Sequence, residues 1–133
     1  MEKAEGESYA RIVSSASIQS MWLAKAAGLF IANAVWRLTG WLPAGRALVG
    51  ALGSPNENVR TIAGIFLEKA GKKAEPLLEE ALEKRENLST VLIILGDIGA
   101  RRFEQDIRRF SQDPDPKIAS AARDALRILN AHN

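Results

Sequence analysis

The side chains of this sequence that could carry chemistry are carboxylates and arginines, because it holds no cysteine and one histidine, His132. Without cysteine there is no disulfide, thiolate metal ligand or cysteine nucleophile. A single histidine near the end of the chain argues against histidine-based zinc sites and Ser-His-Asp triads. We therefore expect no catalytic residue, no metal site and no cofactor, and a protein that is not an enzyme.

Carboxylates at helical spacing form the first candidate group. Glu75, Glu79 and Glu83 recur every four residues, and lysines and arginines bracket them. Paired carboxylates can serve as general acid and base or bind a cation, but only where they converge on a pocket. The bracketing cations favour a solvated helix face with ion pairs between residues four apart.

Four arginines form the second group, as two adjacent pairs seven residues apart on one predicted helix: Arg101, Arg102, Arg108 and Arg109. Such a stripe could contact phosphates or an acidic partner protein. Glu104 and Asp106 interrupt it, no exposed aromatic residues are interleaved for base stacking, and the net charge of the chain is only +2. We retain the arginines as candidate contacts to an acidic protein. A solvated helix face is the alternative, and nucleic acid is disfavoured.

Three tryptophans form the third group: Trp22, Trp36 and Trp41. Tryptophan is enriched where protein interfaces gain most of their binding energy. It is also enriched in helices that lie at a membrane surface. With Leu29, which shares a helix face with Trp22 and Trp36, these residues are candidate partner contacts.

The elements that must position these residues repeat along the second part of the chain. Val59, Leu88 and Ile118 open three similar apolar blocks at intervals of about 30 residues, covering 59–71, 88–99 and 118–130. Each block is preceded by a second predicted helix, and these helices cover 44–52, 73–84 and 101–111. A period of about 30 residues with two helices per repeat indicates an alpha-solenoid.

The residues of these blocks resemble a known repeat. LGDIG at 95–99, Asp113 and AARDAL at 121–126 are similar to the HEAT-like repeats, particularly the short class of phycobilisome-lyase-type proteins, and Val59-Arg60 keeps the Val-Arg pair of that repeat. The resemblance covers about 44–130. It implies an all-α, right-handed alpha-solenoid of about three helix pairs. It also implies a protein that acts mainly as a scaffold. An enzyme or lyase-related accessory protein is an alternative, although no residue here is specific to a chromophore.

The open end of such a solenoid needs a cap, and the apolar N-terminal segment is the obvious candidate. We expect a helix over about 9–39, and two parts of the chain: 1–42, the tail and capping helix, and 43–133, the repeats. One broad helix face is apolar: Leu23, Ala27, Phe30, Ile31, Ala34 and Leu38. We expect this face to pack on the first repeat. Trp22, Leu29 and Trp36 share the opposite side with Lys25, Asn33 and Arg37, which leaves them available to a partner.

Two other interpretations of this helix remain open. It could be buried all round within one monomer, with Lys25 and Arg37 reaching solvent by their tips. It could also lie on a membrane, with the tryptophans at headgroup level. The segment Met21–Leu42 is long enough to cross a bilayer, but Lys25 and Arg37 would make insertion costly.

Taken together, these patterns predict a non-catalytic adaptor or assembly subunit that binds another protein or a second copy of itself. A peripheral membrane module is the alternative. The first twenty residues lack the charge pattern of a signal peptide, so we expect a cytoplasmic location, with membrane association left open.

Overall fold

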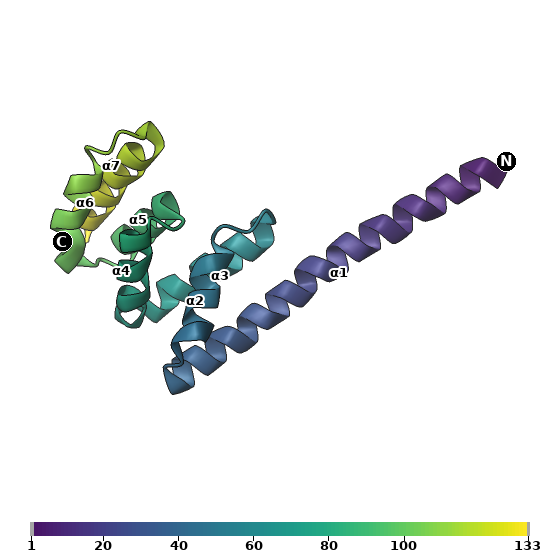
Figure 1. Cartoon of the computed structure of the whole chain (residues 1–133), viewed down its shortest axis with the longest axis horizontal. Helices are drawn as coiled ribbons and strands as arrows, with labels where there is room; N and C mark the ends of the chain where they lie inside the picture. The colour runs from purple at the N-terminus through teal and green to yellow at the C-terminus, as the bar shows by residue number, and fades with distance from the viewer. Residues whose placement is uncertain (1, 133) are drawn as a thin grey trace.

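The computed structural model describes the backbone of residues 2–132 and the side chains of residues 20–132. It is all-helical, and no strand occurs in the described part of the chain. In chain order the elements are α1 (Glu2–Thr39), α2 (Leu42–Ala51), α3 (Glu57–Ala70), η1 (Gly71–Ala74), α4 (Glu75–Lys84), α5 (Leu88–Asp97), η2 (Arg101–Phe103), α6 (Glu104–Phe110) and α7 (Pro116–Ala131). The short 3-10 turns η1 and η2 lead directly into α4 and α6 (Figure 1).

Each periodic block of the sequence forms a helix near its predicted bounds, and local capping explains where several of them begin and end. Asn56 caps α3, where its Oδ1 accepts from the backbone N–H of Val59 at 3.1 Å. Asp115 caps α7 by accepting from Lys117 N–H at 2.9 Å. Gly71 ends α3 with a φ of +57°, a conformation that suits glycine. Asn87 precedes α5 but does not cap it; its amide donates to Val49 O of α2 at 3.1 Å instead.

The helices pack in the order in which they occur. α1 contacts α2 and α3, α4 contacts α2 and α5, and α7 contacts α5 and α6. A single buried cluster extends from Trp36 of α1, through Leu48 and Leu78, to Leu129 of α7. The apolar helix α5 lies in the middle of this cluster, with Val91, Leu92 and Leu95 fully buried. This helix is therefore covered on most of its sides.

A close helix approach joins α5 to α7, and Gly96 makes it possible. A Cβ atom placed on Gly96 would lie 2.8 Å from the carbonyl oxygen of Ala125 and 3.0 Å from its Cα. Only a residue without a side chain allows the two backbones to meet at this distance. The LGDIG and AARDAL segments therefore form one packed contact.

The long helix α1 begins at Glu2, earlier than the predicted start at residue 9, and ends at Thr39 as predicted. Thr39 Oγ1 donates to Val35 O at 2.6 Å, and Gly40 follows with a φ of +74°. The predicted boundary between 1–42 and 43–133 falls at the start of α2. The two parts share one core, because Leu29 and Trp36 of α1 belong to the same buried cluster as α2 and α3.

Candidate interaction surface

The tryptophan side of α1 packs against the rest of the chain. Trp36 is 2% exposed and Leu29 is 7% exposed, while Trp22 is half-buried against the same cluster. Gly45 of α2 makes room for the Trp36 ring, because a Cβ on Gly45 would lie 3.0 Å from Trp36 Cδ1 and 2.6 Å from Leu77 Cδ1. The ammonium group of Lys73 lies 5.9 Å from the centre of the Trp36 ring and donates to Arg37 O.

The expected orientation of α1 is therefore wrong. Leu29 and Trp36 were expected at a surface open to a partner, but they form part of the core. Most of the broad apolar face that was expected to pack on the first repeat lies in solvent instead, and of its large side chains Phe30 keeps a ring contact with the first repeat, at Phe66 of α3. Both sides of α1 carry large apolar residues, so periodicity alone could not decide which side packs against the rest of the chain. The fit of the Trp36 ring over Gly45 decides which side docks.

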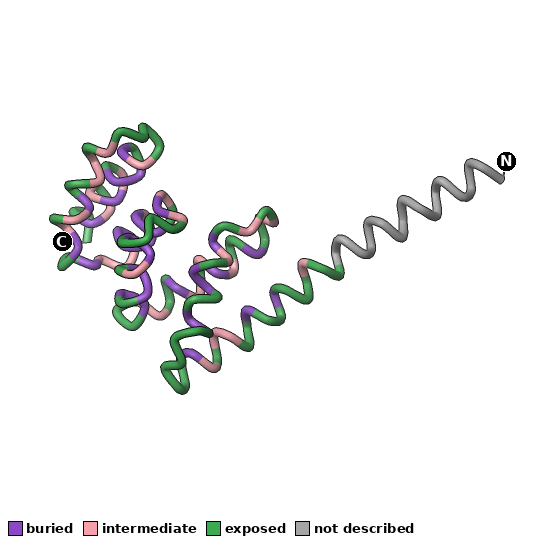
Figure 2. The backbone as a smooth tube through the Cα atoms, in the orientation of Figure 1, coloured by how far each residue is buried: buried purple, intermediate pink, exposed green. Residues whose placement is uncertain are grey.

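The exposed face of α1 carries four large apolar side chains, with exposed fractions of 54% for Leu23, 58% for Phe30, 66% for Ile31 and 86% for Leu38. Ala27 and Ala34 lie exposed between them (Figure 2). We call these six residues the α1 face. The interpretation in which α1 is buried all round within one monomer is excluded by this exposure. Phe30 alone contacts another helix with its ring, edge-on to Phe66 of α3 at 4.9 Å between centroids.

The apolar surface continues beyond the end of α1. Trp41 is 59% exposed and Leu42 is 46% exposed, so Trp41 alone of the three tryptophans is largely in solvent. Contiguous apolar patches of more than about 300–600 Å² are rare on monomers and mark sites of interaction. The α1 face, with Trp41 and Leu42 next to it, has the character of such a site.

The side chain of Asn33, on α1 itself, carries a buried polar atom. The side-chain oxygen of Asn33 is buried and has no hydrogen-bond partner. An unsatisfied buried acceptor costs about 1–3 kcal/mol. Docking of α1 therefore depends mainly on its apolar contacts, through Leu29 and Trp36, with a hydrogen bond from Lys73 to Arg37 O beside them.

The four candidate arginines contact the chain itself. Arg102 pairs with Glu75 and Glu79, each at 3.4 Å, and its guanidinium lies 4.1 Å from the centre of the Phe103 ring. The other three also bind the chain: Arg108 contacts Glu104, Arg109 contacts Asp106, and Arg101 donates to Leu129 O. Carboxylates of the chain thus offset much of the positive charge. The stripe has a weaker basis as a contact for an acidic partner than the sequence indicated.

The carboxylates of α4 are likewise engaged. Glu75 is buried and pairs with Arg102, and Glu80 pairs with Arg46 at 3.1 Å and with Lys84 at 2.5 Å. These cations lower the pKa of Glu80, chiefly through its hydrogen bond with Lys84. The predicted i,i+4 pairing is present for Glu80 and Lys84.

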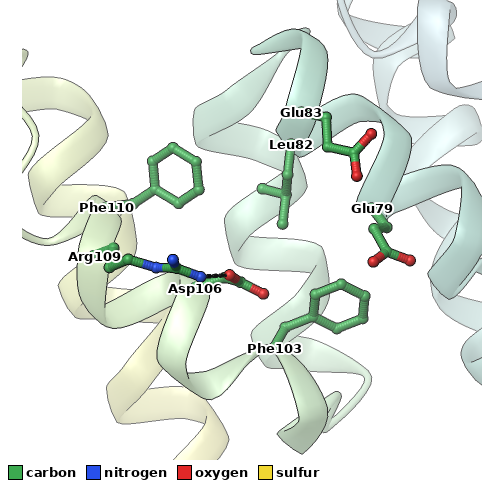
Figure 3. A pocket seen from close by; sticks show the side chains of 7 residues that line it. All are labelled: Glu79, Leu82, Glu83, Phe103, Asp106, Arg109 and Phe110. Atoms are coloured by element: carbon green, nitrogen blue, oxygen red, sulfur yellow. Dashed lines mark hydrogen bonds and ion pairs between the residues drawn. The ribbon is translucent and has the colours of Figure 1, made fainter.

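A cleft between α4 and α6 was not predicted from the sequence. Its volume is about 300 Å³. Seven residues line it: Glu79, Leu82, Glu83, Phe103, Asp106, Arg109 and Phe110. Figure 3 shows that the Asp106–Arg109 ion pair lies along one wall, and that Leu82 comes from the other. Its residues belong to helices of successive pairs, so only the fold brings them together.

A pair of carboxyl groups links α3 to the end of α5. Burial raises the pKa of Glu68 to about 7, and a hydrogen bond with Asp97 and the Asp97 charge add to this effect. Asp97 thus acts as a structural hydrogen-bonding residue at the end of α5. In the described part of the chain, no three acidic or histidine side chains gather as a metal site.

None of the helices, over the residues described, combines the length and hydropathy needed to cross a membrane. Comparison of the chain with protein-family models, with curated proteins and with solved structures finds no match. Its own surface is therefore the basis for a functional proposal.

Proposed function

We propose that this chain is a non-catalytic protein-interaction module, an adaptor or assembly subunit built as a short HEAT-like solenoid with α1 across its first helix pair. Ion pairs between successive helix pairs support the solenoid arrangement. Arg46 of α2 pairs with Glu80 of α4 at 3.1 Å, and Arg85 at the end of α4 pairs with Asp113, before α7, at 2.9 Å. Contacts only between neighbouring pairs are the mark of a repeat array.

The observation that carries the interaction function is the exposure of the α1 face. A helix already folded against α2 and α3 loses little conformational entropy when it binds, so its apolar side chains contribute to affinity. Apolar residues at intervals of three and four positions are those by which a helix enters a groove or packs on another helix. The partner contacts are therefore Leu23, Phe30, Ile31 and Leu38, with Trp41 from the original set.

A protein partner fits this face better than a membrane surface. Burial of Trp36 removes one of the three tryptophans that would lie among headgroups. Lys25 shares the docked side of α1 with Leu29 and Trp36 rather than flanking the exposed face. Interfacial helices need cations beside the apolar face to hold anionic headgroups, and among the α1 side chains that the structure describes, Arg37 alone is close to such a position.

The test compares binding by two matched variants. Ile31→Asp places a charge in the α1 face, and Ile65→Asp places the same charge on α3 at an isoleucine that is 43% exposed outside it. The full chain, tagged and expressed in its native cell, is purified with its bound proteins under identical conditions. We expect Ile31→Asp to lose the bound proteins by at least about tenfold, because one charge in an interface core costs more than 1.4 kcal/mol, and Ile65→Asp to keep them.

Equal retention of partners by both variants would show that the α1 face is not the interface. Sedimentation of the purified chain with anionic vesicles, lost in Ile31→Asp, would favour the membrane surface instead. Circular dichroism and urea titration of both variants establish that neither result comes from unfolding.

A further inference from the structure

The residues of the α1 face form a palindromic pattern along the helix. Its residues are Leu23, Ala27, Phe30, Ile31, Ala34 and Leu38, at intervals of four, three, one, three and four positions. A leucine stands at each end, an alanine follows inside each leucine, and two large side chains occupy the middle. The point of symmetry lies between Phe30 and Ile31. The exposure of all six residues makes this an arrangement of the surface and not only of the sequence.

Two-fold symmetric dimers require this kind of pattern, because the same patch must be complementary to itself. When two identical helices pack antiparallel about an axis between Phe30 and Ile31, each residue meets its mirror position. Leu23 then lies opposite Leu38, Ala27 opposite Ala34, and Phe30 opposite Ile31. Large residues meet large ones and alanine meets alanine.

We propose that the occupant of the α1 face is a second copy of this chain, paired antiparallel along α1. This inference rests on the proposed function and specifies its partner. The two alanine layers allow the helix axes to approach closely, at the short end of the roughly 8–10 Å found between packed helices. The large central pair fills the space between these layers.

Charge favours the antiparallel direction. Arg37 is exposed beside the face. In a parallel pair in register, the two Arg37 side chains would approach one another, and like charges in an interface are unfavourable. In the antiparallel pair Arg37 lies opposite Ala24, and the two arginines are about 20 Å apart along the helix axis. Antiparallel helices also place their dipoles in the favourable direction.

The face offers apolar area for a dimer. Its four large side chains, Leu23, Phe30, Ile31 and Leu38, are each more than half exposed on each copy, and a standard interface covers roughly 800 Å² per partner. Trp41 and Leu42, which continue the apolar surface past the end of α1, supply further area. We expect a dimer that forms at micromolar concentration and weakens on dilution.

The first test measures the mass of the full chain in solution. Light scattering over about 1–100 µM, the range in which a micromolar dimer dissociates on dilution, should show an increase from one chain to two. Ile31→Asp should remain a monomer throughout, and Ile65→Asp should behave as the wild type. A wild-type chain that stays monomeric over this range would overturn the proposal.

The second test measures direction and register, and the absence of native cysteine makes it direct. Ala27→Cys and Ala34→Cys are made as separate variants, one carrying a mass tag. Mild oxidation of the mixture should give the mixed disulfide, because these positions face each other within the roughly 4.4–6.8 Å between Cα atoms that a disulfide spans. Neither variant alone should link to itself, and Ser120→Cys, on the exposed side of α7, serves as the control.

The outcomes separate this inference from the proposed function. Strong self-linking of each single variant would indicate a parallel pair and overturn the antiparallel arrangement. A monomeric chain whose Ile31→Asp variant still loses its bound proteins would overturn the second copy as occupant while leaving the interaction function intact. Unchanged binding by Ile31→Asp would count against both.

Discussion

Gly45 of α2 lies directly against the docked side of α1. Its missing side chain leaves the space into which the Trp36 ring and Leu77 pack. We expect Gly45→Ala to lower the free energy of unfolding by about 1–3 kcal/mol, because the new methyl group overlaps both side chains. Urea titration followed by circular dichroism measures the change.

The matched control lies on the same helix. Gly50 has nothing within 4 Å of the place where a Cβ would be. Replacing it by alanine should raise stability by about 0.5–1 kcal/mol through helix propensity alone. If Gly45→Ala stabilises the chain as much as Gly50→Ala does, the Trp36 ring does not depend on this space.

The carboxyl group of Glu68 makes stability depend on pH. Its pKa rises from the usual 4.5 to about 7 in the folded chain, first through burial and then through Asp97. A carboxyl that binds its proton more tightly when folded contributes stability below pH 4.5, and this contribution is lost as the pH rises to about 7. Glu68→Gln should remove that loss, which we place at about 1 kcal/mol because the side chain is partly screened by solvent.

The measurement is the difference in unfolding free energy between Glu68→Gln and the wild type at several pH values. The difference should grow in favour of the variant between pH 4.5 and pH 7 and then level off. Glu80 and Asp113, whose pKa values are lowered by their partners, act in the opposite direction but are common to both proteins. Glu83→Gln, at an exposed position on α4, is the matched control variant. A flat difference for Glu68→Gln would remove the carboxyl pair as its cause.

At the scale of elements, the contact between α5 and α7 is the most demanding. We expect Gly96→Ala to separate the two helices and to reduce stability by about 2–3 kcal/mol, since the added Cβ would meet the backbone of Ala125 and not a movable side chain. Gly28→Ala, on α1 with no neighbour within 4 Å, is the control and should be neutral or stabilising. Thermal unfolding of both variants decides between these outcomes.

The helices themselves could be predicted from the sequence, because apolar spacing marks them and turn residues such as Asn56 and Asp115 separate them. Which side of α1 packs against α2 and α3 could not be predicted in this way. Its two sides have similar apolar content, and the feature that distinguishes them, the space over Gly45, lies on the next helix. The symmetry of the α1 face was visible in the sequence, in the spacing of Leu23 and Leu38 about Phe30 and Ile31. This symmetry bears on binding only because the fold leaves these residues exposed.

The residues of the candidate site, too, could be predicted only in part from the sequence. Exposure of Trp41 is consistent with its expected role, while Trp36 joined the core. The arginines at 101–109 could be placed on one helix from their spacing, but their partners Glu75 and Glu79 come from another. Contacts between elements that are distant in sequence depend on how the helices stack, and local periodicity does not contain that information.

At the scale of the whole molecule, α1 is part of the core as well as the surface. Removal of residues 1–42 would take away Leu29 and Trp36 and expose Leu48 and Leu77, which are now buried. We expect the truncated chain to lose more than about 4 kcal/mol of stability, comparable to the loss of a buried tryptophan. Urea unfolding of both chains tests this. A truncated chain as stable as the full one would mean that α1 is dispensable to the fold.

The placement of the tryptophans also gives the unlabelled protein its own optical reporters. Trp36 is buried on the docked side of α1, with the Lys73 ammonium near its ring, whereas Trp41 is exposed to solvent beyond the end of the helix. In a Trp22→Phe background, which removes the half-buried third tryptophan, a Trp41→Phe variant should emit at shorter wavelength and resist quenching by iodide, and a Trp36→Phe variant should do the reverse. Undocking of α1 would then shift the first signal, and a partner covering the tip of the helix would shift the second.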